Sequence, residues 1–145
     1  MVLACAGVFA AVFMPKATKA ANPETDLQAV QQVCGRCHTI AVFLKEPRSW
    51  DRWNDVFEDM TRRGATGTDE QLEQVTRYFF ENLTLVNVNT SPAEELIGVL
   101  GVRDEVAQEI IARRERQRFS DLAQLRAVPG VNAKILEERK GRIQF

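Results

Sequence analysis

The hydrophobic positions in the first half of the chain recur with a helical period. Between residues 24 and 84 three apolar stripes show spacings of three and four residues, which is typical of amphipathic helices. Their members are Leu27, Val30, Cys34 and Cys37; Trp50, Trp53, Phe57 and Met60; and Leu72, Val75, Tyr78 and Phe79. Ser49 is a good N-cap for the second stripe, and Thr68 with Gln71 forms a capping box for the third. We therefore expect three helices.

The second half contains an internal repeat of short helix, glycine turn and longer helix. Gly101-Val102-Arg103 recurs twenty-nine residues later as Gly130-Val131-Asn132. Each turn leads into apolar positions at helical spacing, which include Val106 in the first copy and Ile135 in the second. Neither copy has enough apolar surface to form a core alone, so we expect the two to pack against each other.

The junction between the halves carries no Gly/Ser/Pro-rich linker, so we expect the halves to be docked. The segment Leu85–Val88 looks extended, and Ser91-Pro92-Ala93-Glu94 predicts a capping box with proline at the first helical position. The predicted fold class is all-α, with one small domain over residues 22–84 and a second over residues 85–145.

The N-terminal segment has the features of an export signal. Residues 2–13 form an apolar run of 12, which is too short to span a membrane comfortably. Small residues around Thr18-Lys19-Ala20 offer a cleavage site, although the basic residues expected before the run are missing. We assign residues 1–21 to a signal peptide with a truncated start and expect a periplasmic or extracellular protein without a transmembrane span. A lipoprotein anchor at Cys5 is the less favoured alternative.

Composition narrows the possible chemistry. The chain has 145 residues with 19 basic and 20 acidic side chains, and this balance disfavours nucleic-acid binding through bulk positive charge. A single histidine excludes a multi-histidine metal centre, and the eight glycines form no nucleotide-binding motif. Because three helices in about 60 residues make a thin core, the first domain needs a staple, a metal or a cofactor.

Cys34-Gly35-Arg36-Cys37-His38 matches the attachment signature of c-type haem. Two thiols at positions i and i+3 of one helical face can each add to a vinyl group of one porphyrin, and the next residue can aim its imidazole at the iron. Zinc would require a fourth ligand, and a thioredoxin-like CxxC would require a βαβ context that is absent. We therefore expect one covalent haem c.

The axial ligands follow from the residues that are available. His38 is the only histidine, so it is the expected proximal ligand. Met60 is the only methionine outside the expected signal peptide, and we predict it as the distal ligand. Simple core packing of Met60, ligation by Lys45 and an open sixth position are the alternatives. Trp50, Trp53 and Phe57 are expected to line the haem pocket.

The first domain resembles small exported class I cytochromes c. The resemblance comprises the CxxCH motif, the tryptophan-bearing helix with its methionine, the stretch Arg63-Gly64-Ala65 and the aromatic pair Tyr78-Phe79. It implies thioether bonds at the two cysteines, a proximal His38 and a distal Met60. The methionine follows the motif sooner than it does in full-length mitochondrial-type cytochromes.

The second domain is similar to tandem helix-hairpin-helix domains, and its opening V-N-V-N-T-S-P-A-E-E-L resembles competence DNA receptors of the ComEA type. In that family the turn carries glycine, an aliphatic residue and a second glycine, and amides at the next helix start bind a DNA phosphate. Here Arg103 and Asn132 replace the second glycine. The candidate DNA contacts are Gly101, Val102, Arg103, Gly130, Val131, Asn132 and Lys134.

The leading functional interpretation is an exported monohaem electron carrier that serves redox partner proteins and docks to DNA or protein through its second domain. The alternative is an extracytoplasmic receptor for double-stranded DNA whose haem is structural or redox-regulatory. A gas or redox sensor would require a labile sixth position. No catalytic constellation is visible, so we do not expect an enzyme. Residues 86–145 hold ten basic and nine acidic side chains, and the run Arg113–Arg118, otherwise a solvated helix end, is their only concentrated basic segment.

Overall fold

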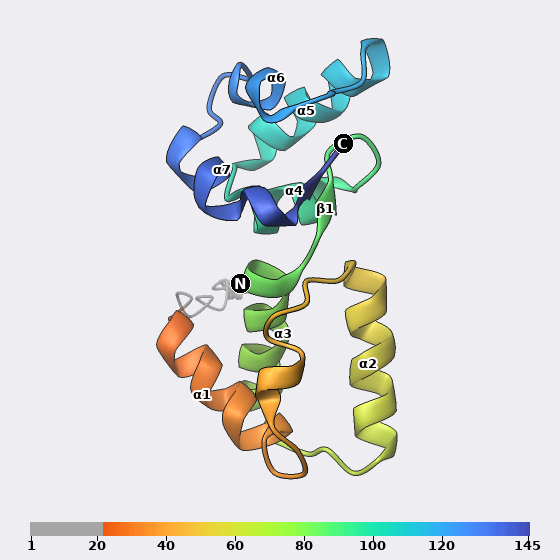
Figure 1. Ribbon diagram of the computed structural model, residues 1–145, viewed down its shortest axis with the longest axis vertical. Helices are drawn as coiled ribbons and strands as arrows, with labels where there is room; N and C mark the ends of the chain where they lie inside the picture. The colour runs from red at the N-terminus through yellow and green to blue at the C-terminus, as the bar shows by residue number, and fades with distance from the viewer. Residues whose placement is uncertain (1–21) are drawn as a thin grey trace, which may run out of the picture.

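The computed structural model describes residues 22–145, so the expected signal peptide lies outside the described residues. The chain is mostly helical, as predicted, and forms two helical halves stacked along the long axis of the molecule (Figure 1). None of the described helices is long and apolar enough to cross a membrane. The elements in chain order are α1 (Pro23–Cys34), η1 (Ile40–Val42), α2 (Trp50–Arg62), α3 (Asp69–Leu83), β1 (Val86–Asn87), α4 (Ala93–Leu100), α5 (Asp104–Arg116), α6 (Leu122–Arg126), α7 (Ala133–Arg139), η2 (Lys140–Arg142) and β2 (Ile143–Gln144).

The front half is organised around the antiparallel packing of α1 on α3. Asp26 near the start of α1 receives two hydrogen bonds from Arg77 near the end of α3, at 2.7 and 2.8 Å. At the other end Gln71 donates to Gln32 at 2.8 Å. The predicted capping box at the start of α3 is present. The buried core of this half consists of Ala29, Val30, Val33, Trp53, Val75, Phe79 and Leu83.

Helix α2 is strongly amphipathic, but its apolar face is only partly covered. Of the stripe predicted from the sequence, Trp53 is fully buried, whereas Trp50, Phe57 and Met60 are half-buried. Trp53 packs against the Phe79 ring of α3 with ring centroids 4.7 Å apart. The described residues of the front half therefore leave part of this face to solvent.

Three local expectations were wrong. Helix α1 ends at Cys34, so Cys37 and His38 lie in the following turn and do not share its helical face. Leu72 is 43% exposed because it lies on the side of α3 away from the core. Ser91 does not cap α4, which begins after Pro92, because its hydroxyl accepts the Asn87 amide hydrogen instead.

The back half has its own core, formed between α4, α5, α6 and α7. A two-stranded parallel sheet closes it, in which Val86 of β1 pairs with Ile143 of β2. The two halves are in contact at α3 and α4, where the Phe80 ring occupies the space that a side chain at Gly98 would need. Arg142 also donates to the Thr84 carbonyl at 3.3 Å, although this guanidinium has no carboxylate partner among residues 22–145. Burial, with a smaller effect of Arg139, lowers the pKa of Arg142 to about 10.

Candidate functional site

The two glycine turns of the back half pack against each other's helices in a reciprocal way. A Cβ placed on Gly130 would lie 2.6 Å from Val106 Cγ2 in α5, and one placed on Gly101 would lie 3.4 Å from Ile135 Cδ1 in α7. Val106 and Ile135 each follow their own glycine by five residues, so the contacts are equivalent. Both glycines have positive φ angles, 64° at Gly101 and 89° at Gly130, which L-residues avoid. The sequence repeat is therefore also a structural repeat with pseudo-twofold symmetry.

This reciprocal packing places the starts of α5 and α7 side by side. At the first turn, the amides of Arg103, Asp104 and Glu105 donate to no acceptor among the described residues. At the second turn the same holds for Asn132 and Ala133. Unpaired amides at a helix start, together with the helix dipole, form an environment that favours an anion. The structure thus brings the seven predicted DNA contacts together around two neighbouring turns.

The two turns differ sharply in charge. Asp104 and Glu105 occupy the first positions of α5, whereas Ala133 and Lys134 occupy the equivalent positions of α7. Two carboxylates beside the α5 amides repel a phosphate, while the ammonium of Lys134 attracts one. The Asn132 side chain accepts from the Lys134 and Ile135 amides at 2.9 and 3.3 Å. Asn132 therefore caps α7. The backbone amides of Asn132 and Ala133 take no part in this cap and remain available to a ligand.

Several basic side chains of the back half serve the fold. Arg139 donates to the carbonyls of Gly98 and Val99 at 3.1 and 2.8 Å, and so caps the end of α4. Arg114 donates to the carbonyls of Val88 and Ser91. By contrast, the side chains of Arg103, Arg116 and Arg118 are exposed and make no hydrogen bond or ion pair with residues 22–145. These three guanidinium groups are available to an anionic partner.

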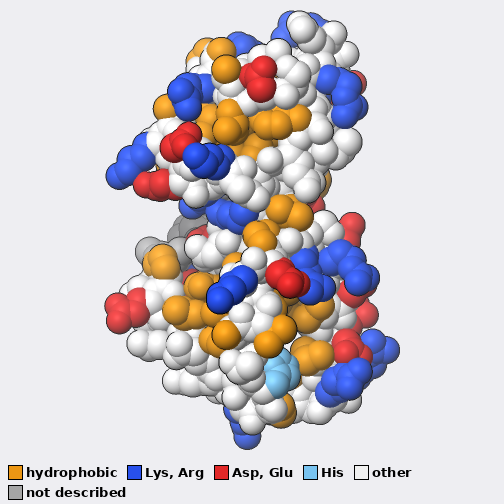
Figure 2. Space-filling view, in the orientation of Figure 1, with side chains coloured by type: hydrophobic (Ala, Val, Ile, Leu, Met, Phe, Trp, Pro, Cys, Tyr) orange, Lys and Arg blue, Asp and Glu red, His pale blue; other side chains and the backbone are white. Residues whose placement is uncertain are grey.

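The CxxCH motif forms a turn at the end of α1. Both of its thiols are free, and Cys34 is half-buried against the front core while Cys37 is exposed. Burial raises the pKa of the Cys34 thiol. Figure 2 shows the imidazole of the single histidine, His38, at the surface beside hydrophobic side chains. Its Nδ1 lies 3.3 Å from the Thr39 carbonyl oxygen, and no described residue bonds its Nε2, the nitrogen that could then bind a metal ion.

The other predicted haem contacts all lie on α2. Met60 is half-buried in the last turn of α2, and its carbonyl accepts from the Ala65 amide at 2.9 Å. Trp53 Nε1 donates to the Leu83 carbonyl at 2.9 Å, so its polar group is already satisfied. Trp50 and Phe57 contact each other edge to face, with centroids 6.2 Å apart. Within the described residues Trp50, Phe57 and Met60 are thus partly exposed on this face, whereas Trp53 belongs to the buried core.

The donor set of the front half fits a covalent porphyrin better than a zinc ion. No group of three or more His, Cys, Asp or Glu side chains within residues 22–145 could hold a metal ion by itself. Two free thiols, an imidazole with an unengaged Nε2 and a partly uncovered apolar face on α2 are instead the groups that a haem c requires.

Similarity to known proteins is found in the back half. Residues 81–144 match the family model described as a helix-hairpin-helix motif. Over 60 residues the chain is 42% identical to ComE operon protein 1 of Bacillus subtilis (strain 168), a match that covers 41% of this chain and 29% of that relative. The chain thus spans less than a third of the relative's length. No solved structure gives a significant match. The helix-hairpin-helix domain is therefore supported, whereas the family match begins at residue 81 and does not include the CxxCH turn.

The charge difference between the two turns was not predicted from the sequence. The signal was present, because aligning the repeats on Gly101 and Gly130 places Asp104-Glu105 opposite Ala133-Lys134. Gln124 gave no such signal, since only the tertiary structure brings it to the hollow that Arg116 and Gln117 line at the end of α5.

Proposed function

We propose that this protein binds double-stranded DNA through the phosphate backbone, using the paired hairpin turns of its second half. The observation that carries the proposal is the reciprocal Gly130–Val106 and Gly101–Ile135 packing, which sets two sets of unpaired amides side by side. The helix-hairpin-helix match and the resemblance to competence DNA receptors support it. Of the two main interpretations of the sequence, the comparisons favour the DNA-binding one.

The mechanism is electrostatic and depends little on base sequence. The amides of the exposed residues Asn132 and Ala133 have no acceptor among residues 22–145. The Lys134 side chain of the same turn is 84% exposed, and its ammonium lies 3.8 Å from Glu138. These groups suit the acceptor oxygens and charge of a phosphate. The first turn adds the Arg103 guanidinium, but Asp104 and Glu105 weaken its attraction. We infer that the second turn makes the stronger contact and that the role is binding, not catalysis.

A gain-of-function experiment tests this proposal. The double variant Asp104→Ala, Glu105→Lys gives the first turn the residues of the second, so it should bind a fluorescently labelled duplex more tightly, with a steeper dependence on salt. The control Asp51→Ala, Glu58→Lys makes the same charge change on exposed positions of α2 and should have little effect. Failure of the wild-type protein to bind duplex even at low salt would refute the proposal.

We further propose that the front half holds one covalent haem c. Cys34 and Cys37 would form the thioether bonds, His38 would ligate the iron through Nε2, and Met60 would be the distal ligand. Trp50 and Phe57, the half-buried aromatic side chains of α2, would cover the porphyrin and exclude water, with the buried Trp53 supporting them from the core; the exclusion of water favours the less charged state of the iron. When bound, the group supplies one-electron chemistry, and it would give the DNA-binding protein a redox-active centre in a periplasmic or extracellular setting.

Mass determination and a haem stain on protein matured in an export-competent host test the haem proposal. The expected result is a covalent mass increase of one haem and a Soret band, both abolished in Cys34→Ala, Cys37→Ala. Free or disulfide-bridged thiols without Soret absorbance would overturn it. This result would leave the DNA proposal untouched, since that proposal depends only on the second half.

A further inference from the structure

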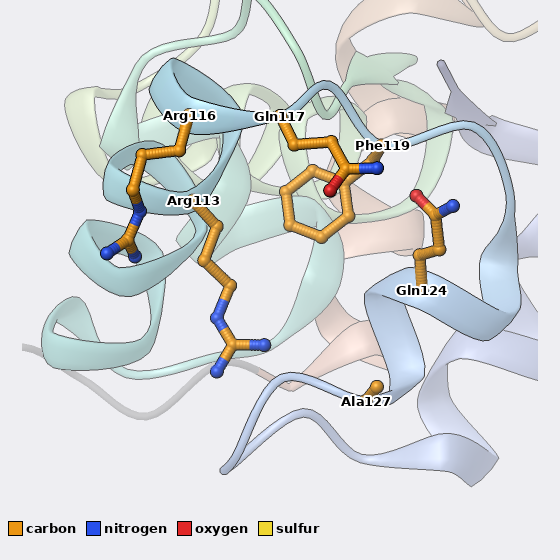
Figure 3. Close-up of a pocket in the computed structure, with 6 residues that line it drawn as sticks. All are labelled: Arg113, Arg116, Gln117, Phe119, Gln124 and Ala127. Carbon is orange, nitrogen blue, oxygen red and sulfur yellow. The ribbon is translucent and has the colours of Figure 1, made fainter.

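A hollow of about 380 Å³ lies between the end of α5 and helix α6. It is lined by Arg113, Arg116, Gln117, Phe119, Gln124 and Ala127 (Figure 3). In this view Gln117 crosses the Phe119 ring from the end of α5, Gln124 extends beside the ring from α6, and the two arginines of α5 extend away from it. Among residues 22–145, no acidic side chain lines the hollow. The hollow is thus apolar at its base and basic and amide-rich at its rim.

The polar groups of this rim are predominantly hydrogen-bond donors. The Gln124 side-chain oxygen already accepts the Ser120 amide hydrogen at 3.0 Å, so its amino group is the part left to bind a ligand. Arg116 makes no hydrogen bond or ion pair among the described residues, although its charge contributes, after that of Arg113, to the lowered pKa of Glu109. Arg113 is held by Glu109 at 2.6 Å, a pairing that lowers the pKa of Glu109. A rim rich in donors and poor in acceptors matches an anion with several acceptor oxygens.

The base of the hollow is fixed in place. The buried Asn89 side chain donates to the Phe119 carbonyl at 2.9 Å and accepts from the Phe119 amide at 2.8 Å. Phe119 itself is 6% exposed. Because both backbone groups of this residue are tied to a segment 30 positions earlier, a ligand would not have to order the loop on binding.

The hollow continues the surface that begins at the second hairpin turn. Ala127 precedes Gly130 by three residues, and Gly130 packs on Val106 of α5. Arg113 follows Val106 by seven residues, which is two turns along the same helix face, or about 10.5 Å. This separation exceeds the rise of about 3.4 Å per nucleotide of one DNA strand, so a single strand held at the second turn is long enough to reach the hollow.

We infer that this hollow is a second phosphate-backbone site, which takes a phosphodiester group of the DNA strand held by the second turn. The Gln124 amino group donates to the phosphate oxygens, Arg116 supplies positive charge from the α5 side of the rim, and the apolar base formed by Phe119 accommodates the adjoining deoxyribose. The inference rests on the proposed DNA binding and extends it to a part of the domain outside both hairpins.

The experiment measures duplex affinity of the full chain across a series of salt concentrations. Arg116→Gln should weaken binding several-fold and reduce the slope of log affinity against log salt by about 0.9, the contribution of one phosphate contact. Arg116→Lys keeps the charge and should retain most of the slope. Arg62→Gln is the matched control, since it removes one exposed guanidinium, 75% exposed, from the front half. Circular dichroism confirms that each variant is folded.

The possible outcomes separate the two proposals. A wild-type slope in Arg116→Gln would overturn this inference and leave the proposed function intact. An equal loss in Arg116→Gln and Arg62→Gln would also overturn it, because the effect would then reflect net charge alone. Absence of duplex binding by the wild-type protein would overturn both.

Discussion

Gly130 packs so closely on Val106 that a Cβ at the glycine would lie 2.6 Å from the valine Cγ2 atom. The contact joins the second glycine turn to the helix that follows the first turn, and its equivalent joins Gly101 to Ile135. Each hairpin therefore stabilises the other. The relationship agrees with the expectation that the two copies pack against each other, and it fixes the spacing of the two turns proposed to contact DNA.

The first prediction concerns this contact. Gly130→Ala should destabilise the back half by about 2–4 kcal/mol, because it combines a positive φ of 89° with a clash against Val106. Gly64→Ala is the control for backbone strain alone, since Gly64 has a φ of 96° and open space around it. In a double-mutant cycle measured by urea denaturation, Val106→Ala should relieve part of the Gly130→Ala penalty. Strict additivity would contradict the steric explanation.

The second prediction concerns the ion pair between α1 and α3. Asp26 is 2% exposed and bonds Arg77 in a bidentate manner, which raises the pKa of Arg77. Asp26→Asn should lower the free energy of unfolding of the front half by about 3 kcal/mol, because it leaves a partly buried guanidinium without its counter-charge. As a control, Asp55→Asn breaks the exposed ion pair with Arg52 and should change the free energy of unfolding by less than about 1 kcal/mol. If urea denaturation gave the same loss of stability for Asp26→Asn and Asp55→Asn, the burial of Asp26 would not explain the contribution of its ion pair.

The third prediction concerns pH. Asp121 caps α6, and hydrogen bonds from the Gln124 amide, the Ser120 hydroxyl and the Ala123 amide hold its pKa below the usual value. The stability that this carboxylate provides is therefore present above its unfolded pKa and is lost as the pH falls through its lower folded pKa. Asp121→Asn keeps a capping oxygen but does not titrate. Its melting temperature should fall less than that of the wild type between pH 5 and acid conditions, and an unchanged acid dependence would exclude this carboxylate as a contributor.

The fourth prediction concerns the distal haem ligand. Met60→Ala in the exported, haem-loaded protein should abolish the sulfur-to-iron absorption band of the ferric state, because residues 22–145 contain no other methionine. Val56→Ala truncates another half-buried side chain of α2 and should leave that band in place. A band that persists in Met60→Ala would eliminate Met60 as the ligand, whereas a wild-type protein that lacks the band would favour Lys45 or an open position.

Much of the local structure was readable from the chain itself. The stripe of Trp50, Trp53 and Phe57 marked α2, and Thr68 with Gln71 marked the start of α3, since periodicity and capping are local properties. The predictions that were wrong, such as the burial of Leu72, depended on which side of a helix packs against another element. That choice is made by packing, which periodicity alone does not specify.

The sequence by itself determined the helical character of the chain, the repeat around Gly101 and Gly130 and the chemistry available in the CxxCH turn, because all three depend on residues close together in the chain. The tertiary structure decided the reciprocal contact of the glycine turns and the hollow between α5 and α6. It also showed that the apolar face of α2 is only partly covered. These features join residues far apart in sequence, and their geometry arises from steric fit and hydrogen bonding between elements, which a one-dimensional pattern does not contain.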